Sequence, residues 1–204
     1  MKNNEDFTPH VLLEALKRTQ GRMPIVPGAI SWVRIILVPV AALAVLDCRY
    51  GALFPIAVAG AISDYLDGLV ARRLKQASYP GKILDFLAGK FFIFCILILL
   101  DRINALNSVT TMITAWYHIA VLAAMALLSW SVRFPVVTVP TAEKLVIIIS
   151  YSLILAATGS LAFPWKGVFS NLCGILSIIA PVSVIFGVAA YLRTSRKVLS
   201  RFLQ

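Results

Sequence analysis

Six apolar segments, each close to 20 residues long, limit the folds that this sequence can adopt. About 20 residues of α-helix cross the hydrocarbon layer of a bilayer, which is roughly 30 Å thick. The composition agrees with membrane insertion, because 60% of the 204 residues are hydrophobic and only 14% are charged, whereas a soluble domain is about 25% charged. We therefore expect an all-α integral membrane protein with six transmembrane helices. The segments cover residues 28–48, 51–72, 82–100, 109–132, 145–164 and 168–192.

The Lys and Arg residues outside these segments gather on the side of the membrane that carries both ends of the chain. Because basic loops stay in the cytoplasm, we expect both termini to be cytoplasmic, in the inner or plasma membrane of the cell. The net charge of +10 is also compatible with nucleic-acid binding. However, basic residues at segment ends suit an anionic leaflet and a phosphate-bearing substrate better, so no nucleic-acid partner is expected.

The sequence predicts a single domain, without internal repeats. Before the first span, residues 10–19 predict a short amphipathic helix, with Leu12 and Leu16 on its apolar face. Such a helix anchors a chain to the membrane surface. The expected parts of the domain are a cytoplasmic juxtamembrane segment 1–27, a six-span core 28–192 and a basic cytoplasmic tail 193–204.

Three carboxylates, Asp64, Asp67 and Asp85, lie inside the second and third apolar segments. An unpaired ionised Asp at the centre of a bilayer costs about 2.5 to 3.5 kcal/mol on insertion scales, so a bound cation is expected there. At 100° per residue, Asp64 and Asp67 share one helical face with Gly68 and Ala71, whose small size admits a close neighbour or ligand. Oxygen ligands at this density, in a setting of phosphate chemistry, favour Mg²⁺ or Mn²⁺.

Two other interpretations of the carboxylates remain open on the residues alone. Acidic residues in membrane spans also mark ion or proton pathways. They could instead pair with Arg72, Arg73 or Lys82 and fix the membrane interface. Against pairing, Arg72 projects about 80° away from Asp64 on a helix, and two aspartates one turn apart make a poor anchor. Metal and phosphate chemistry is therefore preferred.

The run of residues around these aspartates resembles the signature of the CDP-alcohol phosphotransferases. That signature is D-x-x-D-G-x-x-A-R, then eight residues, then G-x-x-x-D-x-x-x-D. Outside the signature, Pro27, Arg34 and Pro39 resemble the opening of bacterial phosphatidylglycerophosphate synthases. Seven of the eight fixed positions match at the same spacing, namely Asp64, Asp67, Gly68, Ala71, Arg72, Gly81 and Asp85.

The resemblance implies a homodimer that transfers a phosphatidyl group from CDP-diacylglycerol to an alcohol such as glycerol 3-phosphate and releases CMP. It implies that one or two Mg²⁺ or Mn²⁺ ions bind Asp64, Asp67 and Asp85. Arg133 and Lys144 are candidates to bind the phosphate of the acceptor. The positions implied to bind CDP are Asp64, Asp67, Gly68, Ala71, Arg72 and Gly81.

The eighth motif position departs from the family, because Gly89 stands where the family has a fourth Asp. In the family that Asp is a metal ligand and the proposed general base, and glycine can be neither. Asp101 lies sixteen residues beyond Asp85, roughly 24 Å along a helix, which leaves Glu143 as the one candidate replacement. Lys90 is expected either to place a cation near position 89, or to be an ordinary basic residue that pairs with Asp85 or extends its ammonium group toward the membrane surface.

Two interpretations of function follow from Gly89. The chain is either an enzyme of phospholipid synthesis, or an inactive homologue that binds CDP-lipid or supports a partner protein. A substitution introduced into an active lineage would produce the same sequence. His118, alone in the fourth apolar segment, is expected to be a hydrogen-bonded core residue and not a metal ligand.

Overall fold

A computed structural model describes residues 25–73, 79–132, 140–164 and 166–202 of the chain. All the regular structure in these residues is helical, as predicted. The amphipathic helix expected at residues 10–19 lies outside the described part. The elements are α2 (Ile25–Leu46), a short 3-10 helix η1 (Tyr50–Ala52), α3 (Leu53–Arg73), α4 (Tyr79–Arg102), α5 (Ser108–Val132), α6 (Thr141–Ala162) and α7 (Lys166–Phe202).

Four of these helices are long and apolar enough to cross a membrane: α4, α5, α6 and α7. In α2 and α3 the apolar stretches are shorter, at Ser31–Leu46 and Tyr50–Leu66. Four of the six predicted spans therefore have the length and hydropathy of a membrane-crossing helix, and the count of six spans remains a prediction.

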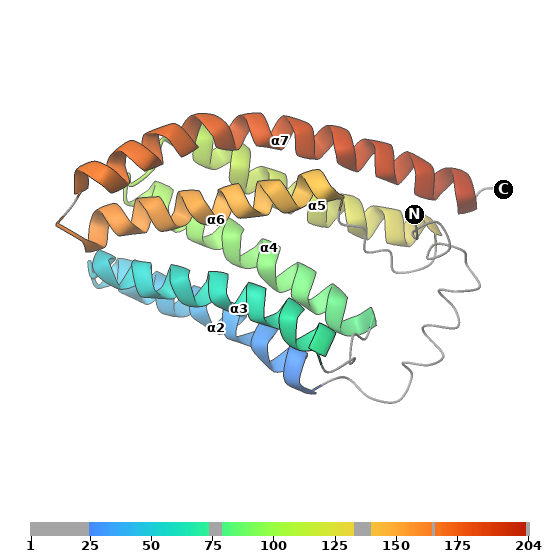
Figure 1. Cartoon of the computed structure of the whole chain (residues 1–204), viewed down its shortest axis with the longest axis horizontal. Coiled ribbons are helices and arrows are strands. Elements are labelled where there is room, and N and C mark those ends of the chain that lie inside the picture. Colours follow the sequence, from blue (N-terminus) through green and yellow to red (C-terminus); the bar gives the residue numbers. More distant parts are fainter. Residues whose placement is uncertain (1–24, 74–78, 133–139, 165, 203–204) are drawn as a thin grey trace.

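The helices form a bundle in which α4 lies between two pairs of neighbours. Helices α2 and α3 pack together on one side, and α6 and α7 pack together on the other (Figure 1). Helix α4 contacts α2, α3, α5 and α6. The start of α2 and the end of α7 lie at the same end of the bundle (Figure 1). An even number of antiparallel helices requires this arrangement.

The central position of α4 follows from its apolar residues. Phe92, Ile93, Ile96, Leu97 and Leu100 are almost completely buried, and this spacing forms two adjacent rows on one helical face. The face packs against α2, α3 and α6 in the main core. A smaller core joins α5, α6 and α7. The site described below lies where α4 meets α2 and α3.

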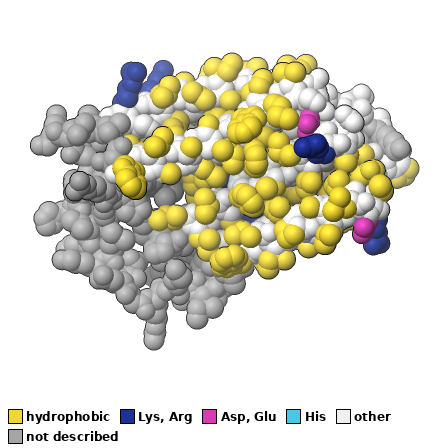
Figure 2. Space-filling view, turned by 180° about the vertical axis from the view of Figure 1, so that it is seen from behind, with side chains coloured by type: hydrophobic (Ala, Val, Ile, Leu, Met, Phe, Trp, Pro, Cys, Tyr) yellow, Lys and Arg dark blue, Asp and Glu magenta, His cyan; other side chains and the backbone are white. Residues whose placement is uncertain are grey.

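The outer surface of the bundle is apolar. Side chains such as Ile178, Ile185 and Phe186 of α7 are 73%, 68% and 66% exposed. Figure 2 shows hydrophobic side chains over most of the described surface on one face, with few charged groups among them. A soluble protein rarely exposes so large an apolar area, whereas lipid tails cover it at no cost. The chain is therefore a membrane protein.

Gly60 allows α3 to approach α4 closely. A Cβ atom at this position would lie 2.3 Å from ring atoms of Phe92, a residue with no exposed surface. Because Phe92 has little room to move, we expect Gly60→Ala to lower the free energy of unfolding by about 1 to 3 kcal/mol. Thermal unfolding of the detergent-solubilised protein would measure the loss.

Gly174 of α7 provides a matched control, because a Cβ atom there meets nothing within 4 Å. Gly174→Ala should leave the melting temperature unchanged or raise it, since Ala has the higher helix propensity. Equal melting temperatures for the two variants would show that α3 and α4 do not pack as described.

Candidate active site

Arg34 of α2 links α3 and α4 through two ion pairs. Its Nη1 donates to Asp64 Oδ1 at 2.6 Å, and its Nη2 donates to Asp85 Oδ1 at 2.5 Å. The guanidinium has no exposed surface, whereas the two carboxylate side chains are 35% and 40% exposed. One planar cation therefore occupies the buried side of two carboxylates that come from different helices, a geometry that suits arginine better than lysine.

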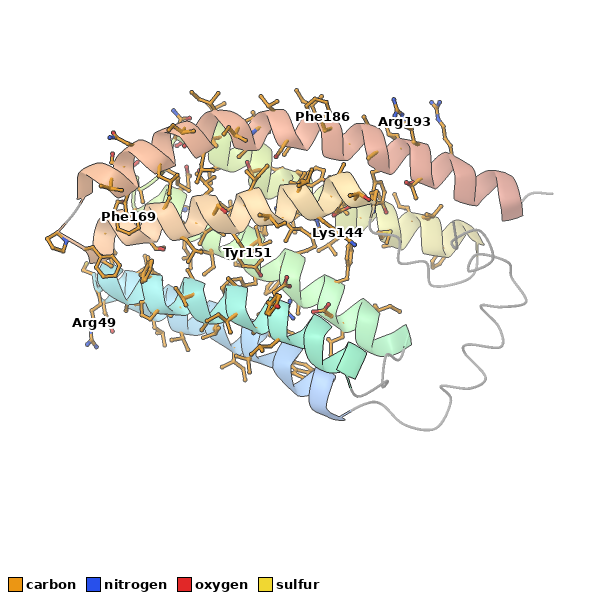
Figure 3. All side chains as sticks on the ribbon, in the orientation of Figure 1. Arg49, Lys144, Tyr151, Phe169, Phe186 and Arg193 are labelled. Atoms are coloured by element: carbon orange, nitrogen blue, oxygen red, sulfur yellow. The ribbon has the colours of Figure 1, made fainter. Side chains whose placement is uncertain are left out.

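Tyr151 of α6 completes the buried side of this centre. Figure 3 shows the residue on the part of α6 that faces α3 and α4. Its hydroxyl lies close enough to Arg34, Asp64 and Asp85 to interact with all three.

Position 89 faces the same centre. A Cβ atom built on Gly89 would lie 3.0 Å from Arg34 Nη1 and 3.2 Å from Asp64 Oδ1. The motif spacing had placed residue 89 one helical turn beyond Asp85, and the backbone of α4 agrees. The guanidinium thus fills the space that a side chain at position 89 would enter.

The remaining motif positions lie on the predicted helices. Helix α3 continues without a break through Asp67, Gly68, Ala71 and Arg72, and Gly81 lies in the first turn of α4. Their side chains fall outside the described structure. Of the two residues expected at the acceptor phosphate, Lys144 is exposed on α6, whereas Arg133 falls outside the described residues.

A second buried ion pair joins α4 to α6, between Lys90 Nζ and Glu143 Oε1. The expected pair between Lys90 and Asp85 is not formed, because the described contacts of the Lys90 ammonium group are with Glu143 and His118. Glu143 is likewise committed to Lys90 and does not join Arg34. Asp101, at the far end of α4, is no replacement either.

His118 of α5 extends this pair into a chain of hydrogen bonds. Lys90 Nζ lies 3.1 Å from His118 Nδ1, and His118 Nε2 lies 3.0 Å from Ser150 Oγ. Because an ammonium group can only donate, Nδ1 must accept and Nε2 must carry the proton. The Ser150 hydroxyl then donates to the Val146 carbonyl at 2.8 Å. Both ring nitrogens are used, which confirms His118 as a hydrogen-bonded core residue.

Comparison with known proteins assigns the family. The family model for CDP-alcohol phosphatidyltransferase matches residues 24–192. The chain belongs to this family. The resemblance seen in the Asp64–Asp85 motif is therefore confirmed over most of the sequence.

Two curated relatives of this CDP-alcohol phosphatidyltransferase family member match in part. The CDP-diacylglycerol–glycerol-3-phosphate 3-phosphatidyltransferase of Aquifex aeolicus is 42% identical over 69 residues, which are 34% of this chain and 39% of the relative. The cardiolipin synthase (CMP-forming) of Streptomyces coelicolor is 32% identical over 97 residues, which are 44% of this chain and 45% of the relative. In each case the match spans less than half of the relative.

CDP-alcohol phosphatidyltransferases generally depend on a divalent metal, and the donor groups present here fit one such ion. Asp64 and Asp85 both bind the guanidinium of Arg34, and both carboxylate side chains are partly exposed. Within the described residues, no group of three or more His, Cys, Asp or Glu side chains is arranged to hold a metal. A metal at this centre would therefore need Asp67, substrate phosphate or water to complete its coordination shell.

The Lys90–Glu143 pair gives a stability prediction. Neutralising one partner, as in Lys90→Met or Glu143→Gln, leaves the other charge buried and unpaired, so each change should cost about 3 to 5 kcal/mol. Denaturant or thermal unfolding in detergent would measure this loss.

The double variant Lys90→Met/Glu143→Gln should lose less than the sum of the single changes, because no unpaired charge remains. Lys144→Met is the matched control, since this neighbouring lysine is exposed. A loss for Lys144→Met as large as that for Lys90→Met would contradict the assigned pairing.

Proposed function

We propose that this chain transfers a phosphatidyl group from CDP-diacylglycerol to an alcohol phosphate such as glycerol 3-phosphate and releases CMP. The supporting observation is the convergence of Asp64, Asp85 and position 89 on one point between three helices. These are motif positions of the family to which the chain belongs. The name of the relative from Aquifex aeolicus contains both proposed substrates.

The chain's own residues would bind and orient the nucleotide. Asp64 and Asp85, with Asp67 one turn along α3, would hold Mg²⁺ or Mn²⁺. When bound, the metal would neutralise the charge of the pyrophosphate and stabilise CMP as the leaving group. The small residues Gly68, Ala71 and Gly81 would leave room for the cytidine diphosphate, and Arg72 would offer its guanidinium to a phosphate oxygen.

The acceptor would enter from the membrane surface at which α6 begins. Lys144, exposed in the first turns of α6, and Arg133 would bind the phosphate of the alcohol. Gly89 supplies no base for the hydroxyl proton, and Glu143 is bound to Lys90. A positioned base usually contributes about 10²- to 10⁴-fold, so we expect slow turnover.

A second candidate function is supported by two observations at position 89. Arg34 fills the space at position 89, and no described carboxylate replaces the missing one. A chain of this kind could bind CDP-diacylglycerol without releasing CMP, and serve as a lipid-binding or partner-supporting homologue. Transfer remains our leading proposal because the carboxylates of both described motif helices are present.

We further propose a homodimer in the cell membrane with both termini in the cytoplasm. The start of α2 and the end of α7 lie at the same end of the bundle (Figure 1). This supports the proposal that both termini are on the same side of the membrane. The excess of basic residues on that side supports the cytoplasm.

Release of CMP from CDP-diacylglycerol in liposomes, with Mn²⁺ and glycerol 3-phosphate, tests the proposed activity. Asp64→Asn should reduce the rate about 100-fold or more, since electrostatic stabilisation of this kind is worth 10² to 10³. Asp47→Asn is the matched control, because Asp47 is exposed in the turn after α2 and should keep the full rate.

The unmodified chain separates the two candidates. CMP release that depends on Asp64 supports the transferase. Binding of CDP-diacylglycerol without CMP release supports the inactive homologue, and absence of both binding and release contradicts the site itself.

A further inference from the structure

Three buried polar atoms near the start of α6 have no hydrogen-bond partner within the described residues. They are Tyr117 Oη of α5, Tyr191 Oη of α7 and Glu143 Oε2 of α6. The three residues are 4%, 6% and 0% exposed. Because a polar group that is shielded from water without a partner costs free energy, buried polar groups in native proteins are almost always hydrogen-bonded. Three exceptions in one region of the bundle therefore require a physical explanation.

The packing of α6 against α7 brings these groups together. A Cβ atom on Gly187 of α7 would lie 2.4 Å from Tyr117 Oη and 3.0 Å from Val146 Cγ2 of α6. Glu143 lies one turn before Val146, and Tyr191 lies one turn after Gly187. Because α6 and α7 run in opposite directions (Figure 1), these two steps lead to the same level of the bundle. The Glu143 carboxylate interacts electrostatically with both phenol groups, which agrees with this placement.

The other side of the Glu143 carboxylate is already occupied. Lys90 Nζ pairs with Glu143 Oε1 and is also 3.1 Å from His118 Nδ1. The ring of Tyr117 covers this ammonium group, with its centroid 5.2 Å from Nζ. Lys90 therefore stabilises one carboxylate oxygen, and Oε2 is left to face the phenol hydroxyls of α5 and α7.

The hydrogen-bonding capacity of the cluster specifies its occupant. Each phenol hydroxyl can donate one hydrogen bond, and an ionised carboxylate oxygen can only accept. None of the three groups bonds directly to another, so a bridging molecule must both accept and donate. The Lys90–Glu143 pair has no net charge, which disfavours an ion as the bridge. A water molecule fits, since buried waters make about three hydrogen bonds to polar groups that otherwise have no partner.

We propose that Tyr117, Tyr191 and Glu143 enclose one ordered water molecule. The water accepts hydrogen bonds from the two phenol hydroxyls and donates one to Glu143 Oε2. It thereby joins α5, α6 and α7 at one point. It also stabilises the negative charge of Glu143, and with it the buried pair that Glu143 forms with Lys90 of α4.

Replacement of each tyrosine by phenylalanine tests the proposal through the sign of the effect. A hydroxyl that binds the water stabilises the fold, so Tyr117→Phe and Tyr191→Phe should each raise the equilibrium constant for unfolding about two- to tenfold. A hydroxyl without a partner would give the opposite result, because its removal relieves an unsatisfied polar group. Denaturant unfolding of the full chain in detergent measures the change.

Tyr65→Phe is the matched control, because Tyr65 of α3 is 66% exposed and its hydroxyl should contribute nothing to stability. Unchanged or increased stability in both Tyr117→Phe and Tyr191→Phe would overturn the proposal.

The double variant Tyr117→Phe/Tyr191→Phe tests whether the two hydroxyls share one water molecule. Loss of the first hydrogen bond weakens the binding of the water, so loss of the second should cost less. The double variant should therefore lose less stability than the sum of the single changes. Strictly additive losses would show two independent sites and would overturn the shared water.

A high-resolution crystal structure of the unmodified chain decides the question even if the variants do not fold. It should show one water molecule within hydrogen-bond distance of Tyr117 Oη, Tyr191 Oη and Glu143 Oε2. A direct hydrogen bond between Glu143 and either tyrosine, with no water between them, would overturn the proposal. A lipid headgroup or a buffer molecule in the place of the water would also overturn it.

Discussion

The ion pairs of Arg34 are the interaction on which the arrangement of α2, α3 and α4 depends. A guanidinium without exposed surface is tolerated in an apolar bundle only if carboxylates neutralise it at short distance. Because Asp64 and Asp85 come from different helices, this requirement fixes how the three helices are rotated and shifted relative to one another. Apolar packing alone specifies this less well, since lipid tails are as apolar as the side chains they replace.

The Lys90–Glu143 pair imposes a similar requirement on α4 and α6. Helix α4 carries Asp85 toward α2 and, slightly more than one turn later, Lys90 toward α5 and α6. The same helix therefore contributes an acid to one polar cluster and a base to another. The charges of Lys90 and Asp64 are also close enough to interact, so the two clusters belong to one electrostatic unit around the centre of the bundle.

The helices and the motif could be predicted from the sequence, but the ion pairs could not. Lengths of apolar segments and the 3.6-residue period determine where helices form, and the motif spacing placed Asp85 and position 89 on one face of α4. Which face of α2 meets α3 depends on packing between residues 30 positions apart. One signal was available: Arg34 and Lys90 are basic residues inside apolar segments, and each needed an acidic partner.

Contacts between distant parts of the sequence also decide which partners the charged residues have. The described partner of Asp64 and Asp85 is Arg34 of α2, which is far from both in sequence. The side chains of Arg72, Arg73 and Lys82, the basic neighbours in sequence, lie outside the described structure. Glu143 does not serve as a replacement base, because it is paired with Lys90 of α4. In both cases the deciding contact joins residues that only the folded bundle brings together.

The length of α7 has a consequence for how the bundle sits in lipid. Its 37 residues extend about 55 Å at 1.5 Å per residue, well beyond the roughly 30 Å of hydrocarbon. Its last turns must therefore rise into the headgroup layer, where Arg193 points away from the bundle (Figure 3). Basic side chains at this end of α7 would bind the phosphates of bilayer lipids. This contact would fix how deep Asp64 and Asp85 lie below the membrane surface.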